Sequence, residues 1–288
     1  GQGVALVARA LRARGARRLA VEDPGFHVHR FVAAHAGLEL VGVPVDGDGL
    51  DTAALAASGA DAVLVTPAHQ SPMGAVLAPH RRAELVRWCE AGDRFALEDD
   101  YDAEYRYDRA PVGTLQGLAP DRVVYLGSAS KVLAPGLRLG WLLLPAALAD
   151  AVAGEKALDD HGTGVLDQLT LADFLERGEL DRHLRRMRPR YRARRDALAA
   201  GLARALPDVK LHGAPAGLHA LATLPDGLDE AALCRAGRRR GVGLHGLTPY
   251  RLHSTGPGGL VLGFAGLSEP ALEAAVGRLV AAVGDVAA

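Results

Sequence analysis

The sequence has few cysteines and no excess of charge. Its 288 residues include only two cysteines, Cys89 and Cys234, and only 5% of the residues are aromatic. Two thiols so far apart give neither a disulfide framework nor the spacing of a zinc cluster, and they suit a reducing cytosol. The formal net charge of −1 excludes the basic composition of a chain that binds nucleic acid through its overall charge. We therefore expect a cytoplasmic protein with both thiols in its cores.

Long apolar runs are also missing. No run reaches the roughly 18 residues that a membrane crossing needs, and no basic segment followed by an apolar stretch opens the chain as in a signal peptide. We therefore expect no membrane partner. Hydrophobic residues nevertheless make up 49% of the sequence, which at this length is enough for one large core and a smaller one.

The segment 123–144 contains the residues with the most reactive chemistry. It reads VVYLGSASKVLAPGLRLGWLLL, two apolar runs that predict buried strands around a polar loop. A lysine becomes a nucleophile when its pKa is lowered, and we expect part burial and the nearby Arg138 to do this for Lys131. Arg138 with the hydroxyls of Ser128 and Ser130 suits a phosphate. The loop therefore predicts a lysine nucleophile beside an anion site.

The chain opens with a turn of small residues, Gly1-Gln2-Gly3, directly before a helical pattern that ends at Gly15. A helix that begins at glycine can bind a phosphate through its free N–H groups. Two histidines further on, His27 and His29, have no cysteine at metal-ligand spacing nearby. We expect no metal there and assign both histidines to a pocket wall or the surface.

The spacing S-x-S-K-x-x-x-P-G-x-R-x-G over residues 128–140 resembles the pyridoxal-phosphate lysine segment of fold-type I aminotransferases. The resemblance implies pyridoxal 5'-phosphate on Lys131, with the phosphate bound at Ser128, Ser130 and Arg138 and by the turn at Gly1 and Gln2. In that family more chain precedes this turn, so we expect upstream residues to be missing from this chain.

The acidic run EDDYD at residues 98–102 is open to two interpretations. A solvated acidic turn explains most such runs. The resemblance instead assigns Asp99 to the pyridine nitrogen, where a carboxylate makes the cofactor an electron sink, and Tyr101 to the phenolate oxygen. Asp100 and Asp102 would then face solvent or neighbouring loops.

Two further contacts follow from the resemblance. Phe26, after a Pro-Gly turn, would stack on the pyridine ring, although a core aromatic at a helix start is equally consistent with the sequence. Ser71 stands where many of these enzymes have asparagine before a proline, so Ser71 or the neighbouring Gln70 would contact the phenolate.

Several stretches are similar to one branch of the family, the MocR-type regulators of the GntR superfamily, which join a winged helix-turn-helix DNA-binding domain to an aminotransferase-like domain. These stretches are His69-Gln70, Tyr191 and residues 98–108, 111–112, 115–118, 183–188, 194–196, 217–219 and 262–265. The resemblance implies an α/β fold, the PLP-dependent transferase fold type I. Its large domain (1–165) would have a mixed, mostly parallel sheet flanked by helices. A connecting long helix (166–205) and a smaller α+β C-terminal domain (206–288) would follow, and a homodimer is implied.

Three functions stay open. The chain could be the effector-sensing domain of such a regulator, in which Lys131 forms an internal aldimine that an amine or amino-acid ligand displaces, with DNA bound only through a domain missing from this chain. It could instead be a PLP-dependent aminotransferase, in which the freed Lys131 moves a proton. It could also be a scaffold that has lost the cofactor. The last strand pattern, residues 260–263, lacks the arginine that commonly binds the substrate carboxylate. Arg251 on the preceding loop is the candidate substitute, although a solvated loop cation is the slightly favoured interpretation.

Overall fold

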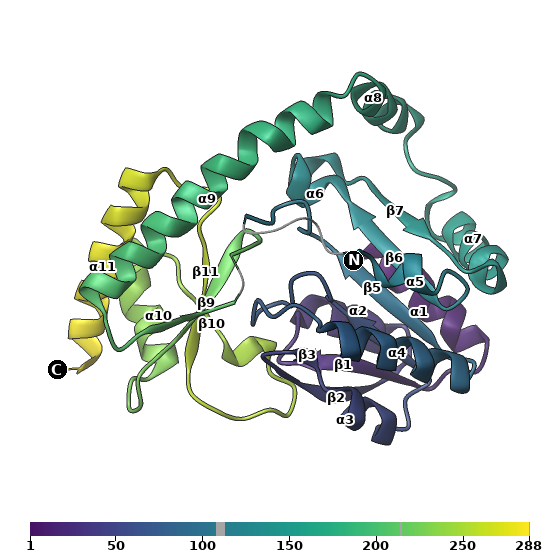
Figure 1. Cartoon of the computed structure of the whole chain (residues 1–288), viewed down its shortest axis with the longest axis horizontal. Helices are drawn as coiled ribbons and strands as arrows, with labels where there is room; N and C mark the ends of the chain where they lie inside the picture. The colour runs from purple at the N-terminus through teal and green to yellow at the C-terminus, as the bar shows by residue number, and fades with distance from the viewer. Residues whose placement is uncertain (108–112, 214, 288) are drawn as a thin grey trace.

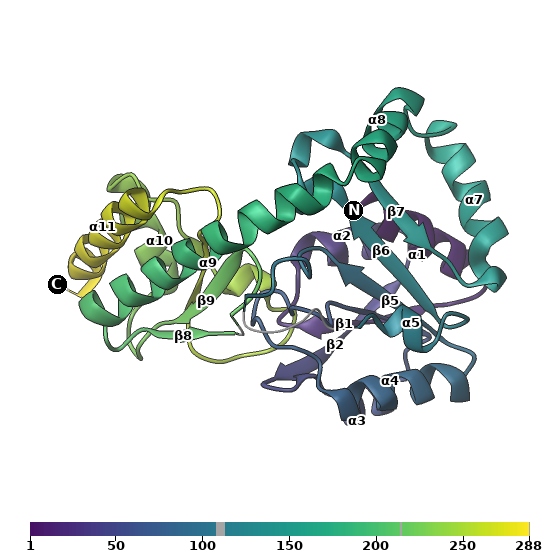
Figure 2. The ribbon, with the colours of Figure 1, turned by 45° about the horizontal axis from the view of Figure 1, so that its top comes forward.

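The computed structural model describes residues 1–107, 113–213 and 215–287. The residues Asp108, Pro111 and Val112 of the regulator-like motif lie outside this part. The described chain forms a large α/β domain and a smaller domain, with a long helix running from one to the other (Figures 1 and 2).

The large domain is built on a seven-stranded sheet of order β3-β2-β1-β4-β5-β6-β7. The central pairs are parallel, whereas β3 and β7 at the two edges run antiparallel to their neighbours. The mixed, mostly parallel sheet that the sequence predicts is therefore confirmed. The strands are β1 (Arg18–Asp23), β2 (Glu39–Asp46), β3 (Gly49–Leu50), β4 (Ala62–Val65), β5 (Phe95–Asp100), β6 (Val123–Ser128) and β7 (Gly140–Leu143).

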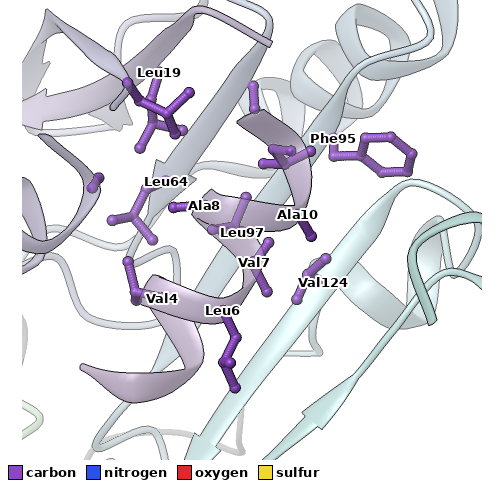
Figure 3. Close-up of a cluster of buried hydrophobic side chains, with 14 of the residues drawn as sticks. Val4, Leu6, Val7, Ala8, Ala10, Leu19, Leu64, Phe95, Leu97 and Val124 are labelled. Atoms are coloured by element: carbon purple, nitrogen blue, oxygen red, sulfur yellow. The ribbon is translucent and has the colours of Figure 1, made fainter. Parts of the chain in front are cut away.

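One face of this sheet is covered by helix α1 (Gln2–Ala13). Val4, Val7 and Leu11 recur at helical spacing and are buried, which places one stripe of the helix against the sheet. They pack with Leu97 and Val124 of the central strands in the main core (Figure 3). The strands β1, β4, β5 and β6 are largely buried, and strands buried on both faces read as near-continuous apolar runs in the sequence. The packing fixes the start of α1 beside the ends of β5 and β6.

The other helices of the large domain flank the sheet or follow the strand ends. They are α2 (His27–His35), α3 (Thr52–Ala57), α4 (Pro79–Ala91), α5 (Leu115–Leu118), α6 (Ala129–Val132), the 3-10 turn η1 (Pro135–Leu137) and α7 (Ala146–Asp160). Helix α4 buries Cys89 in a core cluster with Leu85 of the same helix and Val63 of β4, and burial raises the pKa of this thiol to about 12.

The smaller domain has a four-stranded antiparallel sheet of order β10-β11-β9-β8. Its strands are β8 (Lys210–His212), β9 (His219–Thr223), β10 (His245–Gly246) and β11 (Gly259–Gly263); its helices are α10 (Glu230–Arg239), η2 (Thr248–Tyr250) and α11 (Glu269–Ala287). Cys234 packs at the edge of its core. Among the described residues no helix has both the length and the apolar character that a bilayer crossing requires.

The connection between the domains differs from the single long helix predicted over residues 166–205. It consists of two helices, α8 (Val165–Glu176) and α9 (Glu179–Ala205). They are separated at Gly178, whose φ of +67° a residue with a side chain rarely adopts. Helix α9 contains Pro189 and extends from the large domain along the small one (Figures 1 and 2). The exact domain limits stay a prediction.

Candidate functional site

A cavity of about 390 Å³ lies at the carboxyl ends of β5 and β6, beside the start of α1. Ligands bind at this edge in open α/β sheets. Six residues that the sequence singles out line it: Gly1, Gln2, Asp99, Ser128, Ser130 and Arg138. The fold thus brings the first turn, the acidic strand and the serine-rich loop to one place.

One end of the cavity is built to hold an anion. Helix α1 begins at Gln2 without a side-chain cap, so its first N–H groups are available to a ligand. Ser128 lies at the N-terminus of α6, where its Oγ accepts from the backbone N–H of Ser130 at 3.1 Å. Arg138 adds a cation from an exposed loop. The Gln2 side chain donates to Asp159 and Asp160 of α7, so the turn offers its backbone rather than this amide.

The cavity wall also carries the carboxylate of Asp99 at the end of β5. Burial raises the pKa of Asp99 to about 7, because the charged form loses its hydration. Its Oδ2 lies 3.4 Å from Nδ1 of His29, and burial lowers the pKa of that imidazole to about 4. His29 lines the cavity, so its assignment to a pocket wall is confirmed. The histidine is neutral, and the cation that acts on Asp99 is the Gly1 ammonium group, which opposes part of the rise in the pKa of Asp99.

The acidic run is folded inward and is not a solvated turn. Glu98 is 1% exposed and accepts from the backbone N–H groups of Leu115 and Gln116. Asp100 accepts from the Tyr125 hydroxyl at 2.9 Å. Asp102 is 2% exposed. Asp102 therefore does not face solvent. Of the two alternatives expected for it, only the one that it faces a neighbouring loop is met.

Lys131 is exposed, so the part burial expected for it is wrong. The cause is local, since α6 is one turn long and its buried positions are Ala129 and Val132. Lys131 does not line the cavity, but its positive charge acts electrostatically on His219. Burial, then His69, lowers the pKa of His219 to about 4, and Lys131 adds to the lowering.

Tyr101 and Ser71 lie together beside the cavity rather than in its wall. Burial raises the pKa of Tyr101 well above its usual value, and a hydrogen bond with the Ser71 side chain opposes this. The Tyr101 hydroxyl donates to the His69 carbonyl at 2.9 Å. Gln70 instead fastens the loop, because its amide donates to the Pro24 and Ser71 carbonyls.

Phe26 and Arg251 lie outside the cavity wall. Phe26 precedes α2 and is 37% exposed, with its ring edge-on to His29 at 4.9 Å between centroids. Arg251 donates to the carbonyls of Gly256 and Pro257. Its assignment to a ligand carboxylate stays a prediction that these bonds do not favour.

Sequence reasoning did not identify Trp141, Lys156 and Thr163 as part of the cavity. Trp141 lay inside the segment already singled out, but its strand β7 was recognised only as an apolar run. Lys156 comes from a helix with no motif of its own. The contact between His29 and Asp99 joins residues that local spacing cannot relate.

Comparisons with known proteins agree with this geometry. Residues 1–279 match the family described as aminotransferase class I and II. The chain is 35% identical over 271 residues to the HTH-type pyridoxine biosynthesis transcriptional regulator PdxR of Corynebacterium glutamicum, which covers 94% of this chain and 58% of PdxR. It is 33% identical over 261 residues to the probable rhizopine catabolism regulatory protein MocR of Rhizobium meliloti, which covers 90% of this chain and 53% of MocR.

Among solved structures, the chain is similar to LysN, the alpha-aminoadipate aminotransferase of Thermus thermophilus, crystallised with N-(5'-phosphopyridoxyl)-L-leucine. The TM-score is 0.89 at 25% identity, over 100% of this chain and 76% of LysN. The chain spans little more than half the length of the curated regulators it matches.

Proposed function

Since the chain belongs to the aminotransferase class I and II family, we propose that it is the effector-sensing domain of a MocR-type transcriptional regulator. It binds pyridoxal 5'-phosphate at Lys131 and responds to a small amine or amino acid. The observation that carries the proposal is the cavity, whose wall combines an anion site with the part-buried carboxylate of Asp99, next to the loop that carries this lysine.

The residues present fit the cofactor. The α1 N-terminus, Ser128, Ser130 and Arg138 would hold its phosphate. Asp99, whose pKa burial raises to about 7, would gain a cationic partner in a protonated pyridine ring. Tyr101 and Ser71 would contact the phenolate oxygen, and Phe26 the ring. The cofactor supplies an aldehyde that bonds to amines and a ring that accepts electrons.

The residues of the chain then have separate tasks. Lys131, which is exposed, would bond the aldehyde of the cofactor and would be the group that a ligand amine replaces. Asp99 would hold a proton on the ring nitrogen. Asp23 at the end of β1 ties the large domain to loop 252–254 of the small domain, because its carboxylate accepts from the backbone N–H groups of Leu252, His253 and Ser254 and from the Ser254 hydroxyl. Movement of the small domain would carry the signal.

The regulator is preferred to an aminotransferase for two reasons. The curated relatives at 33–35% identity over most of this chain are named as regulators. The last strand, β11 (Gly259–Gly263), also lacks an arginine to bind a substrate carboxylate. As in the regulators, DNA would be bound by a separate domain. We further infer a homodimer in the cytoplasm.

Turnover separates the two functions. The chain is loaded with pyridoxal 5'-phosphate and mixed with a panel of amines and amino acids, with and without a keto acid. The sensor predicts a change in the visible spectrum without catalytic formation of a new amino acid. Multiple turnovers would establish the aminotransferase instead. A gel-shift assay of the complete polypeptide on DNA upstream of its own gene tests the regulatory half.

A further inference from the structure

Two histidines and an aspartate meet at the joint between the two domains. His69 and Asp102 follow β4 and β5 in the large domain, and His219 begins β9 in the small domain. One nitrogen or oxygen atom from each lies within 4.8 Å of the others. The group stands beside the proposed cofactor site and has no task in the function proposed above.

The His219 ring is arranged like a metal ligand. The Pro72 carbonyl accepts a hydrogen bond from it, whereas Nε2 is buried and has no hydrogen-bond partner among the described residues. A histidine that donates one N–H to a backbone carbonyl presents a lone pair on its other nitrogen, as histidines that bind metals do. Burying that lone pair without a partner costs free energy, which a bound cation would offset.

His69 and Asp102 complete the set of ligands. Nδ1 of His69 lies 3.0 Å from Oδ2 of Asp102, and the two residues are 3% and 2% exposed. Ligand atoms around a tetrahedral zinc lie roughly 3.4 Å apart, so small side-chain movements would bring the three onto one ion. Asp102 supplies the negative charge that a cation needs near Lys131.

The backbone leaves room for this arrangement. Gly217 has a φ of +70°, and a Cβ at this position would collide with both the His69 ring and the Asp102 carboxylate. Tyr101 Oη lies 3.2 Å from His69 Nδ1, next to the position an ion would take. A hydrogen-bonded pair of His69 and Asp102 explains two of the three residues but leaves Nε2 of His219 unexplained.

We propose that His69, Asp102 and His219 bind one divalent transition-metal ion of the zinc class across the domain joint. Two imidazoles and one carboxylate are ligands that zinc accepts, with a fourth position left for water. The ion would tie the small domain to the large one. Local spacing in the sequence gives no sign of this site, because its ligands come from three separate segments.

The test is metal binding by the chain itself. The protein is stripped with a chelator and titrated with Zn²⁺ against a chromophoric competitor, and with Co²⁺ as a visible probe, with and without added pyridoxal 5'-phosphate. The expected result is one ion per chain in both states. His219→Ala and His69→Gln weaken binding at least tenfold. His212→Ala, which removes an exposed histidine of β8, leaves it unchanged, and thermal melts of the metal-free variants check folding.

Two results would overturn the proposal. The first is a stripped wild-type chain that binds no more Zn²⁺ than His219→Ala. The second is binding that needs the cofactor and persists in His219→Ala, since the ion would then sit on the cofactor. Neither result bears on whether Lys131 binds pyridoxal 5'-phosphate.

Discussion

Replacing Asp99 by asparagine should make the cofactor-free chain more stable and the loaded chain weaker. Asp99 has a usual pKa of 3.8, and burial raises it to about 7 in the folded chain. Between these values the unfolded chain has released the proton while the folded chain still holds it. Stability therefore falls as the pH rises through this window and stays low above pH 7.

The size of the effect follows from the shift. A difference of roughly three pKa units corresponds to about 4 kcal/mol, which the ionised Asp99 costs the cofactor-free fold at pH 8. An asparagine at this position carries no charge, so Asp99→Asn should gain stability relative to wild type as the pH rises from 4 to 8. The buried Glu22, whose pKa burial also raises to about 7, keeps part of the slope in both proteins.

Urea unfolding of the cofactor-free proteins at pH 4, 6 and 8 measures this, with Asp226→Asn, an exposed loop residue, as control. The difference between Asp99→Asn and wild type should grow by several kcal/mol over the range, and the difference for the control should stay constant. Binding of pyridoxal 5'-phosphate should weaken in Asp99→Asn, because the ring nitrogen loses its carboxylate. If the difference in unfolding free energy between Asp99→Asn and wild type did not depend on pH, the reasoning that burial destabilises the charged form of Asp99 would be refuted.

Three other changes test the structure. Asp23→Ala should lower the unfolding free energy by about 3 kcal/mol in urea titrations. Burial alone would raise the pKa of Asp23, but hydrogen bonds from Leu252, His253 and Ser254 lower it, so the loss should be largest above pH 4 and shrink as the pH falls through the folded pKa. Gly217→Ala should lower the free energy of unfolding more than the control Gly227→Ala, where φ is also positive but the space for a side chain is open. The control should lose ~1 kcal/mol, and Gly217→Ala about 1–3 kcal/mol more. Equal losses would contradict the packing at the joint. Ser128→Ala and Thr114→Ala each remove a helix cap that contributes about 1 kcal/mol. Only Ser128→Ala should weaken cofactor binding in fluorescence titrations. An equal loss of cofactor affinity in Thr114→Ala would show that Ser128 does not bind the phosphate.

The anion end of the site could be predicted because it rests on local signals. A glycine before an apolar helical stripe gives the start of α1, and the spacing of Ser128, Ser130 and Arg138 lies within one loop. The longer strands of the large sheet are short apolar runs, so their places could be read directly, whereas β3 (Gly49–Leu50) has only two residues and no such run. The parallel order then brings the ends of β5 and β6 together.

Features that depend on tertiary packing could not be predicted. The exposure of Lys131 depends on which face of a single helical turn is buried, and the sequence does not say. The inward folding of Asp102 needs His69, which lies on another loop. The break at Gly178 follows from one positive φ inside a helical pattern, and a single glycine does not reveal that.

The central claim is that Lys131 binds the cofactor, and one measurement tests it directly. The sequence has three lysines, Lys131, Lys156 and Lys210, so peptide mass spectrometry can separate them after the loaded chain is reduced with borohydride. The account predicts the phosphopyridoxyl mass on the Lys131 peptide, its loss in Lys131→Ala and its retention in Lys210→Ala. A label on Lys156 or Lys210 in the wild-type chain, or no label at all, would contradict it.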